Sequence, residues 1–320
     1  MGEFELIRRH FLRARTGPAV ALGIGDDCAL LTPSPGHQIA ISSDMLVEGR
    51  HFFPDVDPQA LGHKALAVNL SDLAAMGARP LGFTLALALP RADDGWLQAF
   101  SNGLLALADA HGCPLVGGDT TRGPLNICIT VFGEVAPGQA LRRDAARPGD
   151  ELWLSGRTGE ARLALERLGG TGWALASPDD EALCRQRLER PAPRLALGRA
   201  LAGVAHAAID LSDGLAGDLG HILAASGVGA EIDLTAMPVA PALQPLPEAA
   251  RTECLLNGGD DYELLFTAPE AVRNEVLRAG AASATPVQRI GRITTGGGLR
   301  LLGPDGRAQP LNARSYDHFA

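Results

Sequence analysis

Short apolar segments of strand length alternate with segments of helical periodicity along most of the chain. In the first 135 residues, strand patterns fall at 38–42, 81–89 and 127–135, and helical patterns fall at 3–14, from Asp57-Pro58 to about residue 77, and from Asp93-Asp94 onward. Such alternation places strands in one sheet with helices packed against it. The first part of the chain is therefore predicted to be an α/β domain.

The same alternation restarts after residues 136–150, which are rich in Pro and Gly and which we interpret as a domain boundary. Beyond it, strand patterns at 151–156, 207–211 and 262–266 alternate with helical patterns at 159–168, 193–202 and after Asp213. A chain of 320 residues has the length of two ordinary domains. The expected fold class is α/β, of the α+β type, with domains over 1–137 and 148–320. The stretches 169–180 and 235–248, rich in Gly, Pro, Ala and Thr, are expected to be connecting segments at the surface.

The charge balance argues against a nucleic-acid-binding protein. The chain has 28 Lys and Arg residues against 37 Asp and Glu residues, a net charge of -9, and Lys64 is its single lysine. A net negative protein does not attract a phosphate backbone. No apolar run approaches the roughly 18 residues that cross a membrane, so no membrane partner is expected either.

The cysteines indicate neither a disulfide framework nor a zinc site. They are odd in number and widely spaced, contain no C-x-x-C pair, and are Cys28, Cys113, Cys128, Cys184 and Cys254. Most are expected to be small core residues. Because the N-terminus begins with acidic residues and lacks a targeting pattern, a cytoplasmic protein is expected.

Aspartates recur beside Gly or Ser where apolar segments end. The combination occurs at five places, which are Asp26-Asp27, Ser42-Ser43-Asp44, Asp72, Gly117-Gly118-Asp119, and Asp210 with Ser212-Asp213. Carboxylate oxygens suit hard cations such as Mg²⁺, and glycine lets backbone N–H groups approach a phosphate. The five places together predict a metal–nucleotide site. Taken singly, each aspartate fits a turn former or a helix cap equally well.

The common nucleotide-binding motifs are absent. A Walker A loop needs Gly-Lys followed by Ser or Thr, but Lys64 lies in GHKA. The protein-kinase motifs do not occur, and GIGDDC has Cys28 where a dinucleotide fingerprint has its third glycine. A nucleotide site in this chain must therefore be of another kind.

Seven motifs spread over nearly the whole chain resemble those of thiamine-monophosphate kinases. They are GIGDDCALL, ISSDMLVEGRHF, KALAVNLSDLAAMGA, GGDTTRGP, IDLSDGL, GGDDYEL and the C-terminal YDHF. That family belongs to the aminoimidazole-ribonucleotide synthetase-like superfamily. The resemblance implies an N-terminal α/β domain that binds ATP and metal and forms a homodimer through its sheet. It also implies a C-terminal α/β domain that completes the nucleotide and substrate site.

The resemblance also implies site residues. Several Mg²⁺ ions around the ATP phosphates would be held by Asp27, Ser42, Ser43, Asp44, Asp72, Asp119, Asp210 and Asp213. Of these, Asp44, Asp72, Asp119 and Asp210 are expected to be catalytic. ATP would be contacted by Gly118, Asp119, Arg143 and Ser212. Without the resemblance, Arg143 fits an exposed surface arginine as well.

Three further residues match positions that contact thiamine phosphate in the family, namely His51, Asp260 and Tyr316. An aromatic face such as that of Tyr316 attracts the cationic thiazolium ring, and Asp260 would complement its charge. This chain has GGDDYEL where the family has GGEDYEL, and Ser43 stands where a Thr is often found. His51 fits a hydrogen-bonded histidine at a strand end if the resemblance is set aside.

The expected reaction is direct in-line transfer of the ATP γ-phosphoryl group to thiamine phosphate, with no phosphoenzyme. A phosphate monoester has a second pKa of about 6, so the acceptor needs no strong base at neutral pH. One alternative is another ATP-dependent synthetase of the superfamily, which acts through an acyl- or seleno-phosphate type of intermediate. The acceptor motifs favour the kinase, and the N-terminal Cys and Lys pair of selenophosphate synthetases does not occur. A second alternative is a non-catalytic protein that binds Mg²⁺ and nucleotide.

Overall fold

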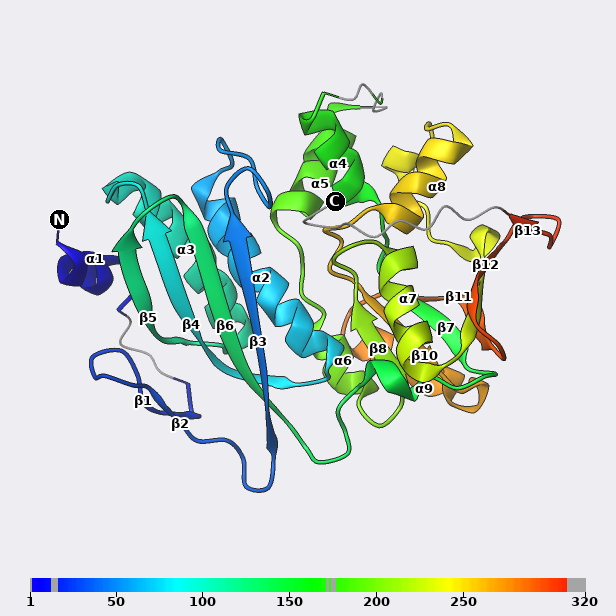
Figure 1. Ribbon diagram of the computed structural model, residues 1–320, viewed down its shortest axis with the longest axis horizontal. Helices are drawn as coiled ribbons and strands as arrows, with labels where there is room; N and C mark the ends of the chain where they lie inside the picture. Colours follow the sequence, from blue (N-terminus) through cyan, green and yellow to red (C-terminus); the bar gives the residue numbers. More distant parts are fainter. Residues whose placement is uncertain (1, 13–16, 171–172, 174–176, 310–320) are drawn as a thin grey trace. The chain divides into compact units, whose positions relative to one another are not determined.

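The structure, a computed structural model, describes residues 2–12, 17–170, 173 and 177–309. The chain divides into two compact units (Figure 1). Unit 1 comprises Met1–Leu73 and Ala78–Gly138, and unit 2 comprises Ala74–Gly77 and Gln139–Ala320. Helices and strands occur in both units, which confirms the predicted α/β class.

Unit 1 is built on a four-stranded sheet with the strand order β3-β6-β4-β5. Its strands are β3 (Gln38–Val47), β4 (Arg79–Leu89), β5 (Leu115–Arg122) and β6 (Asn126–Val135). Strands β4 and β5 are parallel, and the other neighbours are antiparallel. Helices α2 (Pro58–Ala75) and α3 (Asp94–His111) lie against one face of this sheet (Figure 1). Near the N-terminus, α1 (Glu3–His10) precedes a small hairpin of β1 (Val20–Leu22) and β2 (Leu30–Leu31).

Two glycines let α2 and α3 cross at close range. A Cβ added to Gly62 would lie 2.1 Å from the Phe100 carbonyl oxygen, and one added to Gly103 would lie 1.9 Å from that of Gln59. Helix α3 begins where the Asp93 side chain accepts the Trp96 N–H at 3.0 Å, as the Asp-Asp start signal predicts. The helical layer behind the sheet is therefore fixed by backbone contact.

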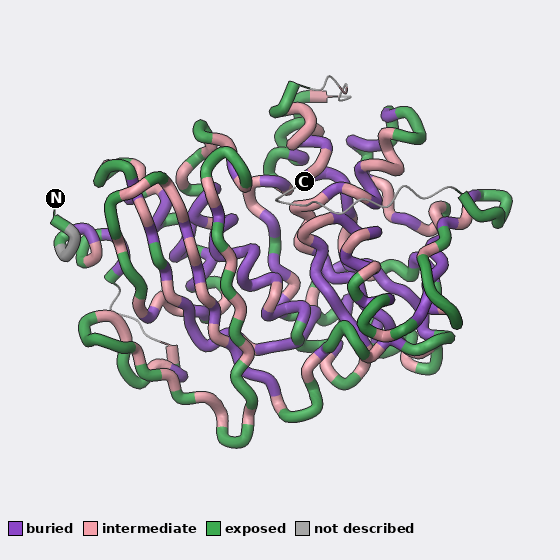
Figure 2. The backbone as a smooth tube through the Cα atoms, in the orientation of Figure 1, coloured by how far each residue is buried: buried purple, intermediate pink, exposed green. Residues whose placement is uncertain are grey.

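The other face of the sheet exposes large apolar side chains. On β3, Ile39 is 45% exposed, Ile41 63% and Met45 53%. Figure 2 shows exposed segments, in green, along this strand. Side chains alternate along a strand, so these three share the face that lies opposite α2 and α3. An exposed apolar strip of this kind is typical of an interaction surface.

Unit 2 is built on a seven-stranded mixed sheet with the order β13-β12-β9-β11-β7-β10-β8. The strands are β7 (Glu151–Ser155), β8 (Ala207–Asp210), β9 (Gly229–Asp233), β10 (Leu264–Ala268), β11 (Val287–Thr294), β12 (Gly298–Leu302) and β13 (Ala308–Gln309). All neighbours pair antiparallel except β9 and β12, which are parallel.

Unit 2 has two apolar clusters, to which both its sheet and several of its helices contribute. The helices of unit 2 are α4 (Glu160–Leu168), α5 (Pro178–Glu189), α6 (Leu195–Leu201), α7 (Leu215–Ser226), α8 (Glu248–Asn257) and α9 (Arg273–Ala282). Short 3₁₀ turns lie at Arg143–Ala145, Leu234–Ala236, Pro241–Leu243 and Glu270–Val272. In one cluster Leu219 and Ile222 of α7 pack with Leu152 and Leu154 of β7. In the other, residues of α4, α5 and α8 pack together.

One expectation about unit 2 is wrong. Residues 235–248 were expected to form a surface connection, but Ala240, Leu243 and Leu246 are buried in the second cluster. The segment is rich in proline and contains a 3₁₀ turn at Pro241–Leu243. Its apolar residues therefore follow neither the helical nor the strand periodicity that would have indicated burial. Within the described part of the chain, no helix combines the length and apolar character that crossing a membrane requires.

Candidate active site

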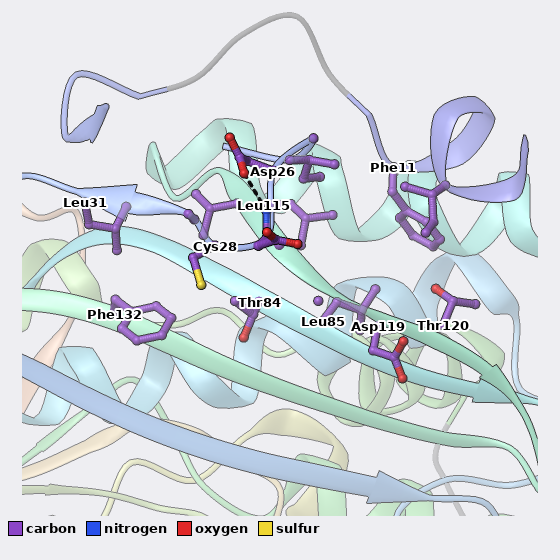
Figure 3. A pocket seen from close by; sticks show the side chains of 18 of the residues that line it. Phe11, Asp26, Cys28, Leu31, Thr84, Leu85, Leu115, Asp119, Thr120 and Phe132 are labelled. Carbon is purple, nitrogen blue, oxygen red and sulfur yellow. Dashed lines mark hydrogen bonds between the residues drawn. The ribbon is translucent and has the colours of Figure 1, made fainter. Parts of the chain in front are cut away.

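A pocket of about 640 Å³ in unit 1 brings two of the predicted motifs together. Asp27 comes from the GIGDD loop, whereas Gly118 and Asp119 come from β5, and all three line the pocket. Figure 3 shows the loop residues Asp26 and Cys28 above the strands, with the Cys28 sulfur directed toward the sheet. Segments about 90 residues apart in the sequence therefore share one cavity.

The pocket walls are acidic and apolar. Its three carboxylates are those of Asp26, Asp27 and Asp119, and its apolar lining includes Phe11, Ile41 and Phe132. None of the described residues that line it is Lys, Arg or His. A polyphosphate placed here would meet like charges unless divalent cations lay between them. The donor set, hard carboxylate oxygens, is the one that Mg²⁺ takes.

Gly118 has to be a glycine. Its φ of 144° lies in a region that L side chains rarely adopt, and a Cβ there would lie 1.9 Å from the Leu85 carbonyl oxygen. Gly117 is different, since the nearest atom to an added Cβ would be Thr84 Cγ2 at 3.8 Å. The close approach of β5 to β4 thus depends on the second glycine of the motif.

Asp72 and the ISSD motif meet between β3 and α2. The Ser42 hydroxyl donates a hydrogen bond to Asp72 Oδ2 at 2.5 Å. The Asp44 backbone N–H donates to Asn69 Oδ1 at 3.1 Å, and Asn69 in turn donates to the Ala65 carbonyl at 3.0 Å. Three predicted site residues are therefore held against one helix.

Ser43 points away from this group. Its hydroxyl lies 2.9 Å from Thr130 Oγ1 and donates to the Ile129 carbonyl at 3.2 Å, across the β3–β6 pair. The pattern also placed the aspartates at strand ends, whereas Asp44 lies within β3 and Asp119 within β5. Strands β3 and β5 are the edge strands of the sheet, where polar residues interrupt the alternation without ending the strand.

His51 follows β3 and is fixed by the backbone. Its Nδ1 accepts the Val47 N–H at 3.0 Å, so a neutral ring carries its proton on Nε2. The side chain is half-buried. This geometry agrees with a hydrogen-bonded histidine at the end of a strand.

In unit 2, the structure joins the IDLSD and GGDD motifs. Asp210 ends β8 and is 5% exposed, and the turn of Ser212 and Asp213 follows it. The Asp260 N–H donates to the Ser212 carbonyl at 2.9 Å, and the Tyr262 N–H donates to the Leu211 carbonyl at 2.8 Å. The predicted nucleotide and substrate residues of this unit are therefore neighbours.

The GGDDY segment has an unusual backbone. Asp260 has a φ of 67° and Tyr262 a φ of 49°, which few residues other than glycine adopt. Both oxygens of Asp261 accept the Gly159 N–H, at 3.0 and 3.1 Å, and this contact anchors the segment at the start of α4. Burial raises the pKa of Asp261 well above its ordinary value. Strain of this kind collects at functional sites, where the surrounding contacts maintain it.

Arg143 and a residue that the motifs did not single out, Asp218, complete this group. Arg143 is exposed and opens the 3₁₀ turn that packs against α7. Asp218 lies in the first turn of α7, is 3% exposed and accepts the Asp213 N–H at 3.1 Å. Burial raises its pKa to about 7, while the N–H groups of Asp213 and Ser212 and the charge of Arg143 act in the opposite direction. In the sequence, Asp218 could have been found as an acidic residue that follows Asp213 by five positions, in the first turn of a helix.

The predicted residues are divided between the two units. Asp27, Ser42, Ser43, Asp44, His51, Asp72, Gly118 and Asp119 belong to unit 1, and Arg143, Asp210, Ser212, Asp213 and Asp260 belong to unit 2. Tyr316 lies outside the described residues. Among the residues that the structure does describe, no group of three His, Cys, Asp or Glu side chains is arranged to hold a metal ion.

Family models match most of the chain. The N-terminal domain of AIR synthase related proteins matches residues 25–135, and the C-terminal domain of the same proteins matches residues 147–303. Among curated proteins, the thiamine-monophosphate kinase of Escherichia coli (strain K12) is 46% identical over 322 residues, which cover 100% of this chain and 98% of that protein.

Solved structures agree with the sequence comparison. The crystal structure of thiamine-monophosphate kinase from Stenotrophomonas maltophilia has a TM-score of 0.85 and 47% identity, and covers 91% of this chain and 93% of that one. The complex of AaThiL with AMPPCP and TMP has a TM-score of 0.78 and 29% identity, and covers 90% of this chain and 89% of that one. The chain therefore belongs to the thiamine-monophosphate kinases, a family of phosphotransferases within the AIR synthase related proteins.

Proposed function

We propose that this chain is a thiamine-monophosphate kinase, which transfers the γ-phosphoryl group of ATP to thiamine phosphate and yields ADP and thiamine diphosphate. The observation that carries the proposal is the pocket in which Asp27, Gly118 and Asp119 meet without a basic side chain among its described lining residues. Such a pocket suits a polyphosphate only together with divalent cations. The E. coli kinase that is 46% identical along the full chain supports the same reaction.

Mg²⁺ ions would be held by Asp27, Ser42, Ser43, Asp44, Asp72 and Asp119 in unit 1 and by Asp210 and Asp213 in unit 2. When bound, Mg²⁺ supplies positive charge that offsets the repulsion between the two phosphate groups. Ser42 and Asp72 are already paired at 2.5 Å, so both offer oxygens at one point between β3 and α2. The Ser43 hydroxyl contacts β6, so it would reach a metal ion from the other face of β3 than Ser42 does.

ATP would be bound by the backbone of Gly118, by Asp119 through its metal, and by Arg143 and Ser212. Gly118 brings the backbone of β5 to the pocket surface without a side chain. The Arg143 guanidinium is exposed and always charged, and it would pair with phosphate oxygens. These contacts hold the nucleotide and orient its terminal phosphate.

Thiamine phosphate would be bound by His51, Asp260 and Tyr316. His51 holds a proton on Nε2, because Nδ1 accepts the Val47 N–H, and the Nε2–H can donate to a phosphate oxygen. The Asp260 carboxylate complements the cationic thiazolium ring. Asp260 is one methylene shorter than the Glu of the family pattern. Its strained backbone, with a φ of 67°, would then help to set the direction in which the shorter carboxylate points.

In the reaction, an oxygen of the thiamine phosphate forms a bond to the γ-phosphorus of ATP as the bond to the bridging oxygen of ADP breaks. The acceptor oxygen is largely ionised at neutral pH, because the second pKa of a phosphate monoester is about 6. The protein therefore needs to position the two phosphates in line and to neutralise their charge. Asp44, Asp72, Asp119 and Asp210 are the carboxylates to which we assign that task.

We also propose that the enzyme is a cytoplasmic homodimer. The exposed side chains of Ile39, Ile41 and Met45 on β3 offer an apolar face for a second copy. Ile39 and Ile41 also line the pocket, so the second copy would border the nucleotide. The five cysteines are free, as in proteins of a reducing compartment.

The test is coupled ADP release by the purified chain with ATP and Mg²⁺, and with thiamine phosphate, thiamine or no acceptor. We expect release with thiamine phosphate alone, and thiamine diphosphate in equal amount by chromatography. Equal ADP release with and without acceptor, or silence with all three despite binding of ATP, would contradict the proposal. The second outcome would direct the search to the amide and selenide acceptors of related synthetases.

A further inference from the structure

Asp218 is a buried carboxylate to which the reaction outlined above gives no role. It lies in the first turn of α7 and is 3% exposed. Its Oδ2 accepts the Asp213 N–H at 3.1 Å, and its carboxylate also accepts the Ser212 N–H. Asp218 thus bonds to the backbone of two consecutive residues that we assign to metal and ATP.

The turn is held from its other side as well. The Ser212 carbonyl accepts the Asp260 N–H at 2.9 Å, and a Cβ on Gly259 would lie 2.4 Å from that carbonyl oxygen. Gly214, which closes the turn, has a φ of 111° and lies so close to Asn257 that a Cβ would approach its backbone to 2.9 Å. The backbone of the turn is therefore held by contacts on both sides.

The carboxylate also interacts with charges of both signs. It is attracted to Arg143 and repelled by Asp213, and Arg143 is another residue that we assign to ATP. A helix start needs no buried acid for stability, since an exposed Ser or Asp cap serves it as well. Burying a carboxylate is costly unless hydrogen bonds compensate, and here the compensating N–H groups belong to Ser212 and Asp213, so Asp218 serves this turn rather than the helix start.

We propose that Asp218 is a positioning residue, which sets the direction in which Ser212 and Asp213 face the bound nucleotide and its metal. This inference rests on the proposed function. Asp218 touches neither substrate, because it acts through the backbone of the turn. An Asn at this position keeps the shape but replaces one acceptor oxygen with an NH₂ donor, so the turn would lose its fixed arrangement.

The test compares Asp218→Asn with a matched variant, Asp150→Asn. Asp150 is also buried in unit 2 and accepts a backbone N–H, that of Arg147, at 2.9 Å, but it has no part in the proposed site. We expect Asp218→Asn to lower kcat/KM for Mg·ATP about tenfold or more. We also expect a rise in the Mg²⁺ concentration that gives half-maximal activity. Asp150→Asn should lower the melting temperature and leave both quantities unchanged.

Unchanged Mg·ATP kinetics in a folded Asp218→Asn enzyme would overturn the inference. So would equal kinetic losses in both variants, because these would reflect stability alone. If Asp218→Asn does not fold, amide hydrogen exchange of the wild-type chain tests the inference instead. The Ser212 and Asp213 amides should exchange much more slowly than those of an exposed turn, and slower still with Mg·AMPPCP. Fast exchange with and without the nucleotide analogue would overturn the inference.

A failure of the proposed function can be distinguished from a failure of the inference about Asp218. If the wild-type chain releases no ADP with thiamine phosphate, the kinase proposal fails before any variant is compared. Binding of Mg·AMPPCP, measured by calorimetry, would then replace turnover as the readout for Asp218→Asn against Asp150→Asn. A folded Asp218→Asn chain that binds the analogue as tightly as wild type would then overturn the inference.

Discussion

The hydroxyl of Ser42 on β3 donates a hydrogen bond to the carboxylate of Asp72 on α2 at 2.5 Å. The bond connects two motifs that are 30 residues apart in the sequence. It helps to fix the orientation of the Asp72 carboxylate. Carboxylates that ligate metals are commonly oriented by a hydrogen bond of this kind, so the contact agrees with the metal-binding role proposed for Asp72.

Replacing Asp72 with Asn should remove most of the turnover and leave the fold intact. The amide oxygen can still accept from Ser42, but the charge that would hold Mg²⁺ is lost. We expect kcat to fall about 100-fold, or ~3 kcal/mol in the barrier. ADP release measured over a range of Mg²⁺ concentrations, with thermal unfolding in parallel, checks this. Asp93→Asn is the matched control, since Asn caps α3 as well as Asp does. Normal Mg²⁺ dependence in Asp72→Asn would remove Asp72 from the metal site.

Alkylation of Cys28 should be slowed by Mg·ATP. Cys28 is exposed and lines the pocket with Asp27, whereas Cys113, Cys184 and Cys254 are buried and burial raises the pKa of each of these thiols to about 12. With Mg·AMPPCP at ten times its Kd, the labelling rate should fall about tenfold. AMPPCP with a chelator should give no protection, and Cys28→Ser identifies the labelled site by mass spectrometry. Protection that does not depend on Mg²⁺ would contradict the role of the acidic pocket.

The two glycines of the GGD motif should differ sharply in their tolerance of alanine. Gly118→Ala would place a Cβ 1.9 Å from the Leu85 carbonyl at a φ of 144°, so we expect a loss of at least about 2 kcal/mol in the free energy of unfolding and weaker nucleotide binding. Gly117→Ala meets only a methyl group at 3.8 Å and should change stability by less than about 1 kcal/mol. Urea unfolding and calorimetry with Mg·AMPPCP compare the two. Equal stability would show that β5 can shift away from β4.

Glu134 should stabilise unit 1 in a pH-dependent way. Burial raises the pKa of Glu134, but hydrogen bonds from Ser34 and Arg79 outweigh it and lower the pKa from 4.5 to about 2. A group whose pKa is lower in the folded state contributes stability that is fully present above 4.5 and is lost as the pH falls toward 2. Glu134→Gln should therefore cost about 3 kcal/mol at pH 7. The difference from wild type should narrow as the pH falls to 3, as urea unfolding at both pH values can measure. A constant difference would contradict the assignment.

Replacing Ile41 with Asp should convert a dimer into a monomer. Ile41 is 63% exposed at the centre of the apolar strip on β3, and a charge there would be desolvated by a second copy. Light scattering should give twice the chain mass of 33.3 kDa for wild type and 33.3 kDa for Ile41→Asp. Leu277→Asp, at a leucine of α9 that is 45% exposed, is the control and should stay dimeric. A wild-type monomer would contradict the dimer proposal.

The fold class and many elements could be predicted because they depend on local patterns. The helix that starts at Asp93 and the strand at 127–135 were found from a cap signal and from apolar content. The predicted strand ends at residue 42, whereas β3 runs to Val47. The prediction stops too early because Ser42, Ser43 and Asp44 interrupt the apolar alternation. Strand β5 was not predicted because Gly117 to Thr121 resemble a turn until they pair with β4.

Residue types indicated the site, but its arrangement depends on long-range contacts. The contact of the Ser212 turn with Asp260 joins segments 48 residues apart, and no local spacing encodes it. The same holds for the opposite orientations of Ser42 and Ser43, which follow from the pleat of β3 and its pairing with β6. Asp218 was missed because an acid in the first turn of a helix is commonplace.

The central claim is that the γ-phosphoryl group of ATP passes directly to thiamine phosphate. Rapid quench of the enzyme with Mg²⁺, thiamine phosphate and ATP labelled in the γ-phosphate tests it most directly. The label should appear in thiamine diphosphate from the earliest times, with none bound to protein and none in inorganic phosphate. A burst of protein-bound label, or label in inorganic phosphate alone, would contradict direct transfer.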